Sequence, residues 1–219
     1  MSILTAQTPV DTLAELVERL GGVPLERIRF FPYPGTATEQ DVVRIEQQEN
    51  RLCELVAGVL VEKPMGFRES LLAVAIASAL RAFVTSSNLG LVTGEGGMMR
   101  LFAGLVRIPD VAYVSWNRLP GRAVPENPIP QLAPNLAIEV LSCSNTAAEM
   151  RTKRHEYFEA GVDLVWIVDP DQRRVTVYTV PEPGRSYGPG DTLEGAPVLP
   201  GFTLDLQQLF AELDRCPND

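Results

Sequence analysis

The chain has 219 residues, 45% of them hydrophobic and 21% charged, an ordinary globular composition that supports one sizeable core. Its formal net charge of −9 argues against a general nucleic-acid coat protein, because Lys and Arg supply most non-specific affinity for phosphates. The longest uncharged apolar run, 70–80, is too short to cross a bilayer, and residues 1–10 lack signal-peptide features, so we expect a cytoplasmic protein without a membrane partner.

The first predicted element is a helix over 11–20, where apolar residues recur at helical spacing before a pair of glycines. We assign it to an N-terminal extension, 1–37. A second helix is predicted over 38–49, because Thr38 and the acids that follow it favour a helix N-terminus through capping and the helix dipole.

A hairpin is predicted next, from two β-prone runs at 51–56 and 59–63. The Ala57-Gly58 pair between them suits a tight turn. The segment 67–86 is apolar nearly all round in its middle, which predicts a helix buried against a sheet.

The rest of the chain is predicted to alternate strands and helices in this order: strands 89–93, 98–103 and 108–115, a long connection 117–134, strand 136–142, helix 145–160, strands 164–168 and 174–180, a loop 181–189 and a final helix 204–213. Because no regular βαβ repeat appears, we expect an α/β (α+β) fold with a mixed β-sheet flanked by helices, not a doubly wound parallel sheet. We place the domain at 38–213 and a tail at 214–219.

Cysteine and histidine exclude two kinds of metal site. The cysteines Cys53, Cys143 and Cys216 are far apart and not in a CxxC arrangement, so neither a disulfide framework nor a zinc cage is predicted. His155 is the only histidine in the sequence, which excludes a multi-histidine site.

Two acids stand in strongly apolar surroundings, where an unpaired carboxylate is costly to desolvate. Asp110 follows Pro109 at the start of a predicted strand, and the alternative interpretation is a turn aspartate. Glu139 lies inside the predicted strand 136–142, and its alternative is a solvent-facing acid on a half-exposed strand. We expect both to have something to bind.

A lysine and a third acid complete the candidate set. Lys153 shares one helical face with Glu149 and Tyr157, four residues away on either side, and its alternative is a surface ion pair. Glu69 stands near the start of a predicted helix, where the dipole favours an acid without any further function. Carboxylates with one lysine suit a divalent-metal phosphodiester hydrolase, because hard cations take oxygen ligands and the lysine adds a separate positive charge.

The order of these residues resembles the Uma family of putative restriction endonucleases, a branch of the PD-(D/E)xK nuclease superfamily. The resemblance runs from Thr38 to Leu213 and is carried by Glu69 and by these motifs: Glu54-Leu55-Val56-Ala57-Gly58, Pro109-Asp110, Ile138-Glu139-Val140-Leu141-Ser142, Lys153, Tyr157, Gly161-Val162, Val165-Trp166-Ile167-Val168-Asp169-Pro170 and Leu199-Pro200-Gly201-Phe202. It implies a restriction-endonuclease-like fold and metal-dependent hydrolysis of phosphodiester bonds, with DNA as the substrate.

The resemblance also implies roles for the four charged residues. Asp110 and Glu139 would bind Mg²⁺ (or Mn²⁺), and Glu69 would add a further ligand, directly or through water. Lys153 would orient the attacking water or stabilise charge on the transition state. The superfamily usually places its lysine two residues after the second acid, but that residue here is Leu141. Lys153 must therefore act from the helix.

Two other functions stay open at this point. A catalytically inactive binding or scaffolding protein that keeps the nuclease fold is favoured by the acidic charge and by the displaced lysine. A hydrolase of a small phosphate compound meets less of an obstacle in the net charge. The sequence also leaves a homodimer open.

Overall fold

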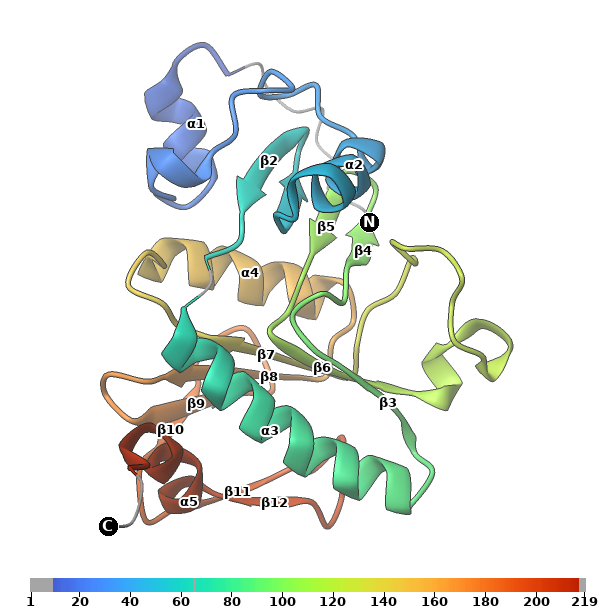
Figure 1. The fold of residues 1–219 in the computed structure, drawn as a ribbon, viewed down its shortest axis with the longest axis vertical. Helices are drawn as coiled ribbons and strands as arrows, with labels where there is room; N and C mark the ends of the chain where they lie inside the picture. Colours follow the sequence, from blue (N-terminus) through green and yellow to red (C-terminus); the bar gives the residue numbers. More distant parts are fainter. Residues whose placement is uncertain (1–9, 65, 217–219) are drawn as a thin grey trace.

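Helical spacing of apolar residues and capping side chains produce five α-helices in residues 10–64 and 66–216, the part of the chain that this computed structural model describes (Figure 1). They are α1 (Leu13–Arg19), α2 (Glu39–Glu49), α3 (Phe67–Ser86), α4 (Ala147–Glu159) and α5 (Leu206–Ala211). Capping boxes start α2, through Thr38 and Asp41, and α4, through Thr146 and Glu149. The five predicted helices are confirmed, α3 with unchanged bounds.

The described strands form three sheets, and only one pair of neighbouring strands is parallel. The large sheet has the order β10 (Arg185–Tyr187), β9 (Arg174–Tyr178), β8 (Leu164–Asp169), β7 (Leu136–Val140), β6 (Val111–Ser115) and β3 (Gly90–Thr93). The small sheet has the order β2 (Val59–Glu62), β1 (Cys53–Val56), β5 (Leu105–Arg107) and β4 (Met99–Phe102). The third sheet pairs β11 (Thr192–Glu194) with β12 (Thr203–Asp205).

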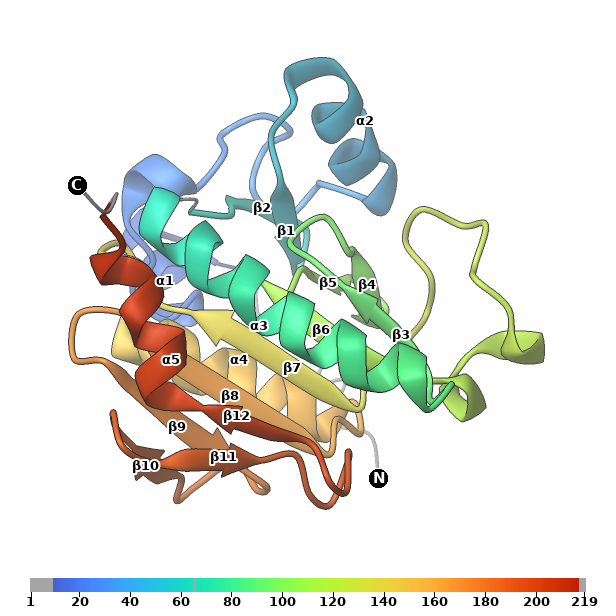
Figure 2. The same cartoon turned by 60° about the horizontal axis from the view of Figure 1, so that its bottom comes forward.

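The parallel pair is β7 and β8, which α4 connects, whereas the other strand pairs are antiparallel. A parallel pair requires such a crossover, because a tight turn can join only antiparallel strands. Figure 2 shows β7 in the middle of the large sheet, with β6 on one side and β8 on the other. The predicted mixed sheet flanked by helices is therefore confirmed.

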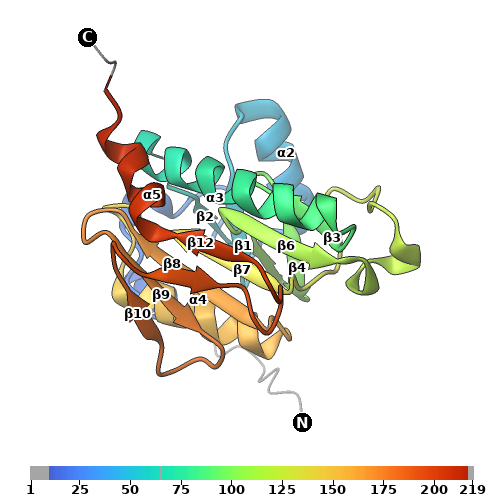
Figure 3. The ribbon, with the colours of Figure 1, turned by 90° about the horizontal axis from the view of Figure 1, so that it is seen from below.

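Helices cover both faces of the large sheet. Leu72, Ile76 and Leu80 of α3 are fully buried in the cluster that contains Ile138 and Trp166 of the sheet. Figure 3 shows the sheet between α3 and α4, and in Figure 1 α4 lies between the large sheet and the small sheet. A side chain of β7 therefore points into a helix-covered interior on either face.

One helix in the described residues, α3, is long and apolar enough to cross a bilayer by length and composition alone. Core helices of soluble proteins pass the same test. The fully buried face of α3 packs on the large sheet, as the sequence predicted for a helix that is apolar nearly all round.

The N-terminal helix packs on the small sheet. Leu16 of α1, with Leu20 and Val23 after the helix, is buried against Val59 and Val61 of β2. The η1 turn (Leu25–Arg27) follows and carries Arg27 toward α4. The boundary between residues 37 and 38 stays a prediction.

Three parts of the strand prediction were wrong. The strand β5 at 105–107 was not predicted, and the predicted strand 108–115 begins only at Val111, because Pro109 lacks the N–H that a continuous ladder requires. A short strand, β10, lies within the predicted loop 181–189, and β11 and β12 were not predicted. Strands of three residues are too short to show an alternating pattern. The connection 117–134 contains two short 3₁₀ turns, η2 (Trp116–Arg118) and η3 (Pro120–Arg122).

Candidate active site

The alternation of side chains along β7 points Glu139 toward α4. Ile138 and Val140 belong to the cluster under α3, whereas Ala137 belongs to the cluster that includes Met150 of α4. Glu139 is two residues after Ala137 and therefore points to the same face of the sheet, and it is only 4% exposed. The alternative of a solvent-facing acid is therefore wrong, because the second face of this strand is covered.

Two side chains of α4 reach Glu139 from the helix. The Lys153 Nζ atom lies 3.5 Å from Glu139 Oε2, and the Tyr157 hydroxyl donates a hydrogen bond of 2.5 Å to Oε1. The spacing of four residues places both on the face that packs against β7. The Lys153 side chain is only 2% exposed, so the alternative of a surface ion pair is wrong.

Burial and neighbouring charge set the protonation of these groups. Burial raises the pKa of Glu139, and the Asp110 carboxylate adds to the increase, while Lys153 opposes it. Burial alone would lower the pKa of Lys153, but Glu139 and Glu54 outweigh it and raise that pKa above its usual value. Burial, with the two nearby carboxylates, also raises the pKa of Tyr157 well above 10.0. The lysine stays charged and the phenol stays protonated.

Asp110 lies beside Glu139, where β6 begins and β7 ends. Continuing the β6–β7 register by one residue from the Val111–Ile138 pair sets the two acids opposite each other. Asp110 Oδ2 accepts a hydrogen bond of 2.6 Å from the backbone N–H of Val140. Asp110 therefore joins the ends of two strands and does not act as a simple turn aspartate.

A second lysine, which the sequence interpretation did not name, pairs with Asp110. Lys63 follows β2, and its Nζ lies 2.8 Å from Asp110 Oδ1. The same ammonium also donates to the backbone carbonyl of Ile108. Its side chain is only 3% exposed. Both carboxylate oxygens of Asp110 therefore have donors.

A third carboxylate comes from the small sheet. Glu54 on β1 lies 3.0 Å from Lys153 Nζ through Oε1, and its Oε2 lies 2.7 Å from Arg107 on β5. Arg107 also pairs with Glu156 of α4, at 2.5 Å. Burial alone would raise the pKa of Glu54, but Lys153 and Arg107 outweigh it and lower it to about 2. We call Glu54, Lys63, Asp110, Glu139 and Lys153 the carboxylate–lysine cluster.

From the sequence, Glu54 was identified only as part of the family resemblance, and Lys63 and Arg107 were given no role in the site. One signal was available for Lys63. Lys63 and Lys153 are the two lysines of the chain, whereas the other 17 basic residues are arginines. Arg107 offered no comparable signal, because its partner Glu54 is 53 residues away in the chain.

Glu69 is the one predicted site residue that no described contact joins to the others. Its carboxylate folds back against Gly66 at the start of α3, the position that the helix dipole favours. Within residues 10–64 and 66–216, no group of three or more His, Cys, Asp or Glu side chains is arranged to hold a metal ion. The role of Glu69 as a ligand stays a prediction.

The side chains of Asp110 and Glu139 fit a hard divalent cation in their chemistry, since both offer carboxylate oxygens as ligands. Each of these four oxygens already accepts from a donor, however: Lys63 and the Val140 N–H at Asp110, Lys153 and Tyr157 at Glu139. A cation that enters would compete with these donors for the same oxygens.

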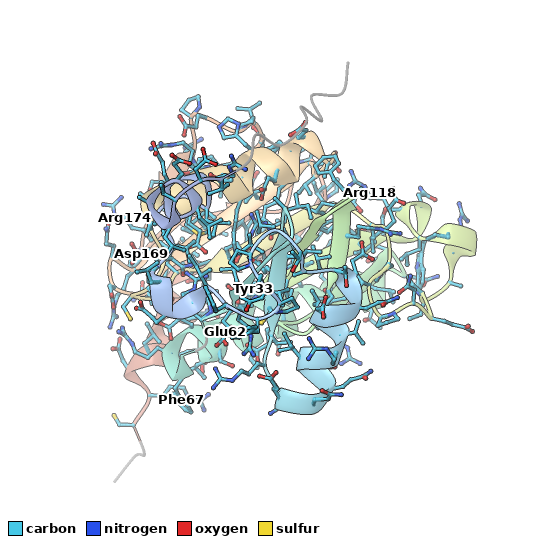
Figure 4. All side chains as sticks on the ribbon, turned by 90° about the horizontal axis from the view of Figure 1, so that it is seen from above. Tyr33, Glu62, Phe67, Arg118, Asp169 and Arg174 are labelled. Atoms are coloured by element: carbon cyan, nitrogen blue, oxygen red, sulfur yellow. The ribbon has the colours of Figure 1, made fainter. Side chains whose placement is uncertain are left out.

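Several basic residues in the middle of the sequence pair with acids. Arg107 and Lys153 are buried and paired with acids. Arg118 pairs with Asp163 at 2.7 Å. Figure 4 shows Arg118 and Arg174 at opposite sides of the molecule. Arg107, Lys153 and Arg118 are therefore each neutralised by an acid.

A mixed sheet between helices, with a buried carboxylate–lysine cluster at its strand ends, defines a restriction-endonuclease-like fold. The chain belongs to the Uma2 family, described as putative restriction endonucleases, whose model matches residues 39–207. A solved structure described as a putative nuclease of DUF820 from Anabaena variabilis ATCC 29413 is similar, with a TM-score of 0.66 and 21% sequence identity. The similarity covers 74% of this chain and 91% of that chain. No curated protein matches. The family predicted from the sequence is confirmed.

Proposed function

We propose that this protein is a metal-dependent endonuclease that hydrolyses phosphodiester bonds in DNA. The observation that supports it best is the convergence of Asp110, just before β6, with Glu139 of β7 and Lys153 of α4, in a chain of the Uma2 family. The three residues are far apart in the sequence. Burying charged side chains costs free energy, and clusters of ionisable groups with perturbed pKa values mark functional sites.

Asp110 and Glu139 would hold Mg²⁺ or Mn²⁺, and Glu69 would contribute through water. A divalent cation bound there would polarise the scissile phosphate and lower the pKa of the attacking water. The Lys153 ammonium is kept charged by Glu139 and Glu54, and it would stabilise negative charge that develops on the phosphate. Its position on α4 replaces the usual strand position, which is Leu141 here.

Two further side chains would orient this machinery. Tyr157 donates to Glu139 Oε1 and so fixes the rotamer of that carboxylate. Glu54 accepts from Lys153, which holds the ammonium between two carboxylates. Side chains that are locked by buried hydrogen bonds keep a site within the narrow geometry that catalysis requires.

The test is cleavage of plasmid and linear DNA with Mg²⁺ or Mn²⁺, and with a chelator as the blank. We expect Asp110→Asn, Glu139→Gln and Lys153→Met each to lose roughly 100-fold or more in rate, since each removes a charge from the reacting centre. Arg151→Met is the matched control, because Arg151 lies on α4 near Lys153 but is 59% exposed. Unchanged cleavage in all three variants would overturn the assignment.

A nuclease-fold protein that binds without catalysis is the second candidate. It is supported by the occupied oxygens of Asp110 and Glu139, which form a complete network with protein donors alone. Calorimetric titration with Mn²⁺ separates the two, since a scaffold has no reason to retain a metal site that Asp110→Asn abolishes. Absence of Mn²⁺ binding together with absence of cleavage would favour the scaffold.

A further inference from the structure

Lys63 occupies a position that suits a cation. Its ammonium contacts one oxygen of Asp110, at 2.8 Å, and the backbone carbonyl of Ile108. A carboxylate and a backbone carbonyl are ligands that hard divalent cations also take. The Lys63 side chain is only 3% exposed, so water does not compete strongly for these two acceptors.

The charges around the cluster limit what can be added to it. Four carboxylates face three cationic side chains: Glu54, Asp110, Glu139 and Glu156 against Lys63, Arg107 and Lys153. The formal balance is therefore one negative charge. A divalent cation would turn it into one positive charge in a mostly buried space, where like charges repel strongly. Departure of one ammonium would return the balance to zero.

Of the three cations, Lys63 is the one held by a single carboxylate. Lys153 lies between Glu54 and Glu139, and Arg107 lies between Glu54 and Glu156. Lys63 also stands directly after the last residue of β2, where the chain leaves the sheet. Its unbranched stem carries a compact point charge that can swing to water, unlike a planar guanidinium held by several bonds.

We propose that Lys63 is a built-in competitor for the divalent cation: its ammonium occupies the cation position on Asp110 in the metal-free protein and leaves when the metal binds. This inference rests on the proposed function, because it requires a metal site at Asp110. It predicts that the wild-type protein binds metal more weakly than its carboxylates alone would allow. Lys63 is therefore a positioning residue that regulates occupancy of the site.

The first test is calorimetric titration of the full chain with Mn²⁺. We expect Lys63→Met to bind at least about 10-fold more tightly than wild type, because the wild-type protein must break the buried Lys63–Asp110 ion pair before the metal can take its place. Asp110→Asn should abolish binding, and Arg151→Met should leave it unchanged. Equal or weaker binding by Lys63→Met would overturn the proposal.

The second test uses the wild-type protein, so it holds even where Lys63→Met fails to fold. Amine labelling followed by mass spectrometry reads two side chains, because the chain has two lysines. In metal-free protein both should be protected by burial. Saturating Mn²⁺ should expose Lys63 to the reagent while Lys153, still paired with Glu54, stays protected. An unchanged Lys63 rate in Mn²⁺-bound protein would overturn the proposal.

The pattern of results separates this inference from the proposed function. Equal Mn²⁺ binding by wild type and Lys63→Met, lost in Asp110→Asn, would refute the role of Lys63 and leave the metal site standing. Absence of Mn²⁺ binding in wild type and Lys63→Met alike would refute the metal site and this inference with it.

Discussion

Glu54 offers the sharpest test of the buried charge network. Its side chain is 1% exposed, and it accepts from Lys153, Arg107 and the backbone N–H of Ile108. Glu54→Gln keeps nearly the same shape but removes the negative charge. Lys153 then keeps Glu139 as its carboxylate partner, and Arg107 keeps Glu156. Both cations stay buried with one negative charge fewer beside them.

The lowered pKa of Glu54 gives the size of the expected loss in the free energy of unfolding. A decrease from 4.5 to about 2 in the folded protein corresponds to roughly 3 kcal/mol of stabilisation by the ionised carboxylate. Removal of one partner from a buried ion pair costs roughly 3–5 kcal/mol, which is consistent. Because the folded pKa is depressed, this stabilisation is fully present above 4.5 and is lost as the pH falls from 4.5 toward 2.

The assay is urea unfolding of wild type and Glu54→Gln at pH 7 and at steps below pH 4.5. We expect the variant to be less stable by about 3 kcal/mol at pH 7, and the difference to shrink with acidification. Glu194→Gln is the matched control, an exposed strand glutamate on β11 whose change should stay within about 0.5 kcal/mol. A difference that is absent at pH 7, or that is equal at every pH, would refute the reasoning.

Two further changes test the supports of the cluster. Arg27→Met removes two hydrogen bonds, of 3.0 and 2.8 Å, to the two carboxylate oxygens of Glu149. It should lower the free energy of unfolding, measured by urea titration, by roughly 3 kcal/mol, because the buried carboxylate loses its ion-pair partner. Tyr157→Phe removes the hydroxyl that donates to Glu139 and should cost about 1–3 kcal/mol, measured in the same way, because that acceptor loses its donor.

Each of these changes has a matched control. Arg51→Met removes a surface ion pair of an arginine that is 57% exposed, and it should change stability by less than about 1 kcal/mol. Tyr178→Phe keeps the ring that stacks under Arg154 and should likewise have a small effect. Equal losses in variant and control would show that the buried partners contribute nothing special.

Local signals in the sequence predicted most of the helices and several strand pairs. Apolar periodicity and the loop residues around it set α3 at 67–86, and Thr38 with Asp41 started α2. The Ala57-Gly58 turn paired β1 with β2. These features depend on neighbours within a few residues. The strand β5 was not predicted, because its three residues are too few to show an alternating pattern.

The candidate site was predicted in part, from the order of its motifs. Asp110, Glu139 and Lys153 were named. Lys153 pairs with Glu139, and Asp110 accepts from the backbone N–H of Val140, the residue after Glu139. Their chemical roles stay proposals. Glu69 was named with them, yet no described contact joins it to the network.

By itself, the sequence determined the helices, the family and the helical face that Lys153 shares with Tyr157, because periodicity and spacing act over a few residues. Only the tertiary structure decided what that face meets. Lys153 pairs with Glu54 across 99 residues, and Lys63 pairs with Asp110 through the packing of the small sheet against the large one. Such ion pairs depend on which sheets and helices cover one another, and no local pattern encodes that packing.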